Sequence, residues 1–131
     1  IVFEEMCYRM MYNSIYDNIN MNTFNFINAT FDDCFARFPT ESEYEAIYPA
    51  IEYNGAGTVF FQIVNNKDEY LNALINSSEF DEGLVRWCYK ALLARDASSY
   101  EVYTLAPVFA NGSNFSAVQR NILISDEYAG I

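Results

Sequence analysis

The chain has 131 residues, of which 52% are hydrophobic and 18% aromatic, and this composition excludes a disordered polypeptide and fits a single domain over residues 1–131. The net charge of −11, with only seven basic residues, would repel a phosphate backbone, so we expect no binding to nucleic acid. No apolar run approaches the ~20 residues of a membrane span, so an integral membrane protein is not expected. Ile1 is interpreted as an internal start, left by removal of a leader or by excision from a longer protein.

The cysteines and the absence of histidine bear on metal and redox chemistry. Cys7, Cys34 and Cys88 lie in apolar helical patterns and are interpreted as small buried hydrophobic residues, with a disulfide between one pair left open. With no histidine and no Cys-x-x-Cys motif, a zinc site is not expected, and no cofactor is predicted.

The first predicted element is a helix over residues 1–19, where apolar side chains recur at helical spacing. The side chains of this stripe, which we expect to face the core, are Phe3, Met6, Cys7, Met10, Met11 and Ile15. The Asn-rich segment 17–23 lacks periodicity and predicts a loop. Residues 24–38 return to the helical pattern, which Pro39 ends because proline disfavours helical conformation in the residue before it.

A capping box predicts the start of the next helix. The Thr40 hydroxyl can accept from the amide of Glu43, whose carboxylate can reach back to the Thr40 amide. This helix should run to about Tyr53 and end at the Asn-Gly-Ala-Gly segment 54–57. Residues 58–64 then predict a short helix capped by Thr58, although the composition Val-Phe-Phe-Gln-Ile-Val also fits a strand.

The middle of the chain carries one short and one longer helical pattern. After a polar break at 65–68, a short helix is predicted through residue 75, followed by a turn at 76–78. In the longer helix, apolar side chains recur at positions that form one face. These are Leu84, Val85, Cys88, Tyr89, Leu92 and Leu93.

Two further capping boxes organise the last third. Ser98-x-x-Glu101 predicts a helix from Ser99 to about Phe109. Residues 111–114 predict a loop, and Ser116-x-x-Gln119 predicts the start of a helix through Ile124.

Matching residues recur at an offset of 58 positions, which predicts an internal duplication. The matched pairs include Ala36 with Ala94, Arg37 with Arg95, Thr40 with Ser98, Glu43 with Glu101, Thr58 with Ser116, and the Asp-Glu-Tyr triplets at 68–70 and 126–128. We therefore expect an all-α, compact bundle of about six to eight short helices built from two similar units, approximately 24–75 and 82–128, with 1–19 as an N-terminal helix.

The run Leu-Leu-Ala-Arg-Asp-Ala-Ser at 92–98 resembles the LLGR-x-P segment of a bacterial helical repeat family of unknown function. That family recurs in RTX-type secreted and S-layer-associated proteins, and the segment also marks the phycobilisome linker domain. Its unit ends in Ser-x-Glu-Tyr/Phe, which stands here at 125–128 and 77–80. The resemblance covers roughly residues 24–131 and implies an all-α domain with a scaffolding or surface role, without a catalytic residue to transfer.

The chain departs from that family pattern at two points. Ala36 and Ala94 stand where the family has glycine before the arginine. The usual tryptophan of the second helix is missing, because Trp87 lies in the preceding helix.

Known catalytic patterns are mostly missing from the sequence. Without histidine, neither a Ser–His nor a Cys–His nucleophile can be assembled, and no glycine-rich phosphate loop occurs. Two carboxylates could still hydrolyse a glycan, and the acids at 68–69 and 126–127 could contribute to a Ca²⁺ site, although they are too few for a complete one.

Three residues are candidates for partner binding. Arg37 and Arg95 either contact a partner or serve the fold, by capping helix carbonyls or by pairing with Glu43 and Glu101. Trp87 is either a filler at the edge of the core or a contact hot spot.

The prediction for function is a non-enzymatic interaction or scaffold domain. The low-Lys, Asn- and Tyr-rich composition resembles secreted bacterial proteins, so we expect an extracytoplasmic location (periplasmic, lipid-anchored or at the cell surface) within a larger protein. The expected partner is another protein or a surface polysaccharide. The alternatives are a carbohydrate- or Ca²⁺-dependent surface module and a carboxylate-dependent glycan hydrolase.

Overall fold

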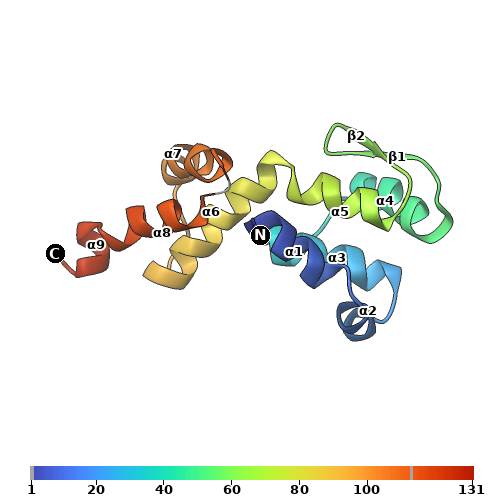
Figure 1. Cartoon of the computed structure of the whole chain (residues 1–131), viewed down its shortest axis with the longest axis horizontal. Coiled ribbons are helices and arrows are strands. Elements are labelled where there is room, and N and C mark those ends of the chain that lie inside the picture. The colour runs from blue at the N-terminus through green and yellow to red at the C-terminus, as the bar shows by residue number, and fades with distance from the viewer. Residues whose placement is uncertain (1, 113) are drawn as a thin grey trace. The chain divides into compact units, whose positions relative to one another are not determined.

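A computed structural model describes residues 2–112 and 114–131, and it divides into two compact units, Ile1–Ser77 and Ser78–Ile131 (Figure 1). The all-α prediction is confirmed, since the described residues form nine helices and only one short hairpin. The first unit contains α1 (Phe3–Met11), α2 (Ser14–Asn20), α3 (Thr23–Phe35), α4 (Glu41–Tyr53), β1 (Gly57–Val59), β2 (Gln62–Val64) and α5 (Lys67–Ile75). The second contains α6 (Ser78–Leu93), α7 (Ser99–Ala110), α8 (Phe115–Leu123) and α9 (Asp126–Ala129).

The core of the first unit lies between α3, α4 and α5. Its fully buried side chains include Ile27, Phe31, Ile47, Tyr70, Leu71 and Leu74. Tyr70 is the largest of them, and its hydroxyl lies 2.6 Å from the hydroxyl of Thr30, a buried polar residue of α3. Because a buried hydroxyl is costly without a partner, this bond fixes α5 against α3 in one register.

The capping box predicted at Thr40 is confirmed. Its hydroxyl accepts from the Glu43 amide at 3.2 Å, and the Glu43 carboxylate accepts from the Thr40 amide at 2.9 Å. The predicted end of this helix is also confirmed, with Asn54 in the left-handed conformation at the C-cap.

The prediction of one helix over 1–19 is wrong, because the chain breaks after Met11 and begins again as α2. The Asn13 side chain caps the second helix by accepting from the Tyr16 amide at 3.0 Å. The loop expected over 17–23 is correspondingly short, since α2 runs to Asn20. Of the six side chains of the predicted inward stripe, only Met11 is buried, while Met10 and Ile15 are 62% and 70% exposed.

The short helix predicted over 58–64 is also wrong, and the alternative strand is correct. β1 and β2 form an antiparallel hairpin with Thr58 opposite Ile63, so Thr58 caps no helix (Figure 1). Gly57 explains how the hairpin reaches α4. A Cβ atom at Gly57 would lie 2.1 Å from the carbonyl oxygen of Ala46, so only glycine permits this approach of the two backbones.

The second unit packs α7 and α8 against α6, and α9 contacts both α6 and α8. Its buried side chains include Leu84, Val85, Cys88, Val102, Leu105, Phe109, Val118 and Ile122. The capping box at Ser98 is confirmed: its hydroxyl accepts from the Glu101 amide at 3.2 Å, and the carboxylate returns to the Ser98 amide at 2.8 Å.

The capping box predicted at Ser116 is not formed. Asn114 caps α8 instead, accepting from the Ala117 amide at 3.0 Å, so Ser116 lies inside the first turn. Ser113, part of the loop expected over 111–114, lies outside the described residues.

Candidate interaction surface

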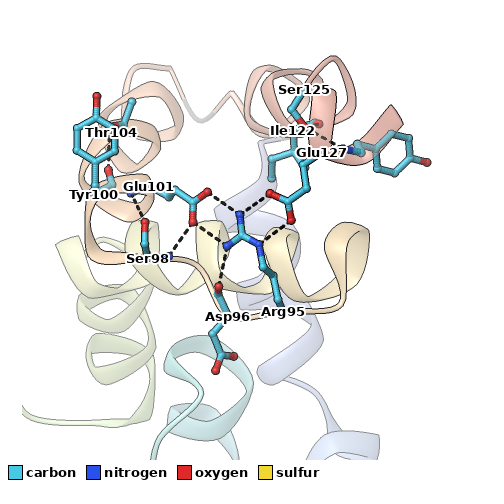
Figure 2. A network of polar contacts seen from close by, with 10 residues as sticks. Arg95, Asp96, Ser98, Tyr100, Glu101, Thr104, Ile122, Ser125 and Glu127 are labelled. Atoms are coloured by element: carbon cyan, nitrogen blue, oxygen red, sulfur yellow. Dashed lines mark hydrogen bonds and ion pairs between the residues drawn. The ribbon is translucent and has the colours of Figure 1, made fainter. Parts of the chain in front are cut away.

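Arg95 ties together three segments of the second unit (Figure 2). Its guanidinium donates two bonds to the Glu101 carboxylate, at 2.8 and 2.7 Å, and two to the Glu127 carboxylate, at 2.7 and 2.8 Å. A fifth bond reaches the carbonyl oxygen of Asp96 at 2.9 Å, and the guanidinium lies over the Tyr89 ring. Bidentate pairs of this kind combine energy with geometric specificity, so Arg95 holds the α6–α7 turn and the start of α9 together.

Arg37 repeats this arrangement in the first unit. It makes two bonds to Glu43, at 2.8 and 3.0 Å, and one to the carbonyl oxygen of Phe38 at 3.1 Å. Its guanidinium lies over the rings of Phe31 and Phe35. The expected pairing of Arg37 with Glu43 and of Arg95 with Glu101 is therefore present, and both arginines stabilise a helix–turn–helix.

These pairs shift the pKa values of the carboxylates. Hydrogen bonds from Arg95 lower the pKa of Glu101 to about 2, and the same guanidinium lowers the pKa of Glu127. The pKa of Glu43 is lowered by its hydrogen bonds from Arg37. These acids therefore stay ionised at neutral pH, which suits ion pairing and does not suit general-acid catalysis.

Trp87 lies on the surface of α6. Its side chain is 58% exposed, and its ring lies 6.3 Å from the Phe115 ring of α8, measured between centroids. The indole therefore packs against Phe115 while more than half of the residue's surface remains accessible to a partner.

A row of aromatic rings runs along α4 in the first unit. Phe24 of α3 contacts Tyr44 at 5.2 Å between centroids, Tyr44 contacts Tyr48 at 5.5 Å, and Tyr48 contacts Tyr53 at 6.2 Å. Phe24 and Tyr53, at the two ends, are exposed, and the two middle rings are half-buried. We call these four residues the aromatic row. In the sequence, the i, i+4 spacing of Tyr44 and Tyr48 predicts that the two rings share one face of a helix, but it does not by itself predict a binding surface.

Two exposed apolar side chains of the first unit stand on strained backbone. Met21 has φ 70° and ψ −39°, and the amide of Asn22 donates to the Asn20 carbonyl at 2.9 Å, which is close to the rare and strained γ-turn of positive φ. Phe60 and Phe61 have φ 52° and 62°, as the two central residues of a tight hairpin turn. The Phe60 ring contacts Phe31, whereas Phe61 is fully exposed and Met21 is 78% exposed.

A cavity of about 230 Å³ opens beside the Met21 turn, lined by Asp17, Met21, Asn22, Thr23, Phe26, Ile51 and Lys67. The Lys67 ammonium lies 2.5 Å from Asp17 Oδ1 and 4.5 Å from the centre of the Phe26 ring. At the side of the cavity, the Thr23 hydroxyl donates to Glu52 at 2.5 Å. No local sequence pattern predicts this site, because its residues come from α2, the α2–α3 turn, α3, α4 and α5.

The first unit is strongly acidic, and its cations are already paired. Residues 1–77 include eleven acidic and three basic side chains. All three basic groups contact carboxylates: Arg9 that of Glu5, Arg37 that of Glu43, and Lys67 that of Asp17. The field around this unit is therefore negative, which favours neutral or basic partners.

The described residues contain no membrane-spanning helix and no cluster of metal ligands. Across residues 2–112 and 114–131, no helix is long and apolar enough to cross a membrane, and no group of three or more acidic or cysteine side chains is arranged to hold a metal ion. In comparisons with known proteins, no family model, no curated protein and no solved structure matches this chain.

Proposed function

We propose that the chain is a non-enzymatic interaction domain that acts outside the cytoplasm, as part of a larger secreted or surface-anchored bacterial protein. It binds another protein through apolar side chains that the fold holds in solvent. The observation that carries this proposal is Phe61, a fully exposed phenylalanine at φ 62°. The extracytoplasmic location is supported by the low-lysine, Asn- and Tyr-rich composition.

The energetics at Phe61 favour a role in binding over a role in folding. A non-glycine residue in the left-handed region costs roughly 1–2 kcal/mol, and glycine avoids this cost. The Phe61 side chain, being fully exposed, recovers none of it by burial. Strain of this kind at an exposed side chain is typical of a contact site, where the benefit comes from the bound state.

Trp87 is proposed as a second contact residue, in the other unit. Tryptophan is enriched among residues whose truncation weakens protein–protein binding most, and the Trp87 ring is already oriented by Phe115. Arg37 and Arg95 support binding indirectly, because they fix the helix–turn–helix in each unit.

The test is selection of peptide ligands from a random phage-displayed library against the immobilised 131-residue chain. We expect selected peptides to bind Phe61→Gly at least tenfold more weakly than the parent chain. Tyr100→Ala is the matched control, because Tyr100 is also a highly exposed aromatic but lies on α7 over an unstrained backbone. Failure to enrich any peptide, or equal affinity for the parent chain and Phe61→Gly, would contradict the proposal.

A surface polysaccharide is the second candidate partner. It is favoured by the aromatic row, because partly exposed tyrosine rings offer both an apolar face and a hydroxyl to a sugar chain.

A further inference from the structure

We infer that the cavity beside Met21 and the aromatic row form one continuous binding site for a neutral glycan chain, with one sugar ring in the cavity and the following sugars along the row. This inference rests on the second candidate of the proposed function, binding to a surface polysaccharide, and deepens it by naming a ligand class and a place. Phe61 is not part of this site, so the two proposals can be tested separately.

The cavity combines the groups that a sugar ring needs. Its lining includes the buried aromatic residue Phe26 and the ion pair of Asp17 with Lys67. One Lys67 proton is used by Asp17, which leaves two donors and a second carboxylate oxygen for hydroxyl groups. The carboxamide oxygen of Asn22 caps α3 by accepting from the Asn25 amide, so the NH₂ group of Asn22 is the hydrogen-bond donor for a ligand.

The lysine in this cavity is held in place before any ligand arrives. Its ammonium lies over two rings, 4.5 Å from the centre of Phe26 and 5.1 Å from that of Tyr12, and its side chain is only 22% exposed. Cation–π contacts and the Asp17 pair therefore fix the donor in one position. Binding a polyhydroxyl ligand to such a donor costs little ordering entropy.

The cavity and the row meet at a single hydrogen bond. Thr23 lines the cavity and donates to Glu52, which lies one helical turn after Tyr48. The next residue in the chain, Phe24, is the first ring of the row, in contact with Tyr44. Glu52 therefore joins Thr23 of the cavity to Tyr48 of the row, and the inferred glycan chain leaves the cavity beside this hydrogen bond.

Size and ring geometry limit the ligand. About 230 Å³ is below the roughly 300–1,000 Å³ of drug-sized sites, so the cavity takes one small ring and not a cofactor. Successive rings of the row are inclined by 68°, 34° and 72° to each other, so they form no flat platform. Such a row suits a single twisting chain better than a crystalline polysaccharide surface.

Charge excludes the acidic polysaccharides. The helix that carries three rings of the row contains the acids Glu41, Glu43, Glu45 and Glu52 and no basic residue. The single cation of the cavity, Lys67, is neutralised by Asp17. A uronic-acid or sulfated chain would be repelled, whereas a neutral chain would meet no electrostatic repulsion.

The experiment is affinity electrophoresis of the 131-residue chain in gels that contain soluble neutral glycans (mannan, xyloglucan and laminarin in separate gels), with polygalacturonate as the anionic comparison. We expect retardation by at least one neutral glycan and none by polygalacturonate. Tyr48→Ala should weaken the interaction at least tenfold, and the isosteric change Thr23→Val should weaken it several-fold.

The control is Tyr103→Ala on α7, which removes a highly exposed tyrosine ring outside the row and should leave retardation unchanged. Thermal melting of every variant checks that the fold is intact, and Phe24→Ala provides a second row variant if Tyr48→Ala unfolds. No retardation by any of the neutral glycans, a stronger response to polygalacturonate, or equal losses in Tyr48→Ala and Tyr103→Ala would overturn the inference.

The outcomes separate the two proposals. If peptides bind in a Phe61-dependent manner while no neutral glycan retards the chain, the interaction domain stands and the glycan site falls. If glycans bind and peptides do not, the glycan site stands and the partner is not a protein bound at Phe61.

Discussion

The two arginine clusters are locally alike, yet the chain that follows them differs. In each, an alanine in the left-handed conformation precedes the arginine, which pairs with the glutamate of a capping box (Ala36 with φ 55° and Ala94 with φ 56°). After the capped helix, the first unit forms the β1–β2 hairpin, whereas the second forms α8. The capping interactions are therefore determined by residues a few positions apart. Whether a hairpin or a helix follows depends on packing against residues that are distant in the sequence.

The largest effect is expected in the core of the second unit. Phe109 is fully buried, so Phe109→Ala should lower the free energy of unfolding by about 3–5 kcal/mol. Ile51, its counterpart at the 58-residue offset, is only half-buried, so Ile51→Ala should cost clearly less. Urea denaturation followed by circular dichroism measures both. Equal losses would show that the two positions are equivalent in packing as well as in sequence.

A smaller loss is expected where the hairpin meets α4. Gly57→Ala places a Cβ atom against the Ala46 carbonyl oxygen and should cost about 1–3 kcal/mol or more, because backbone must shift. Gly55→Ala is the matched control two residues away, where the nearest atom is 3.5 Å from the added Cβ. Thermal melting should separate the two variants, and an unchanged melting temperature for Gly57→Ala would contradict the close approach.

The ion-pair clusters should make stability depend on pH. The folded pKa of Glu101, about 2, lies below its ordinary value near 4.3, so the stabilisation from its pairing is complete above about pH 5 and is lost as pH falls toward 2. Arg95→Met should lower the melting temperature by several degrees at pH 6 and by much less at pH 2.5. Arg37→Met should show the same trend through Glu43. A loss that does not change with pH would show that Arg95 acts through packing alone.

The smallest effect should be a gain. Phe61→Gly relieves a positive φ without removing buried surface, and the entropy of the unfolded glycine offsets part of the benefit, so a net stabilisation of about 0.5–1 kcal/mol is expected. Phe61→Ala, which keeps the strain, should give no gain. Chemical denaturation of both variants measures the difference. If Phe61→Gly destabilises the fold, the side chain serves the hairpin and not a partner.

Sequence reasoning succeeded where the determinants are local. The capping boxes at Thr40 and Ser98 and the Asn54 C-cap involve residues within five positions of each other, and all three are present. The pairing of Arg37 with Glu43 spans only six positions, so it could also be predicted from the sequence.

The failures have physical causes that lie elsewhere in the chain. The hairpin turn has Phe60-Phe61 where glycine or asparagine would signal it, and its position depends on the contact of Gly57 with α4. The break at Asn13 was hidden because apolar spacing continues across it. The cavity and the aromatic row combine residues from several helices, so only the folded chain brings them together. The 58-residue duplication and its unit boundaries stay predictions.

Trp87 is the single tryptophan of the chain, and it lies in the second unit against Phe115. Its intrinsic fluorescence therefore reports on α6 and α8 alone, while far-ultraviolet circular dichroism follows the helices of both units. Coincident unfolding curves from the two signals would indicate that the units melt as one cooperative body. Separated curves would give the stability of each unit without any label or truncation.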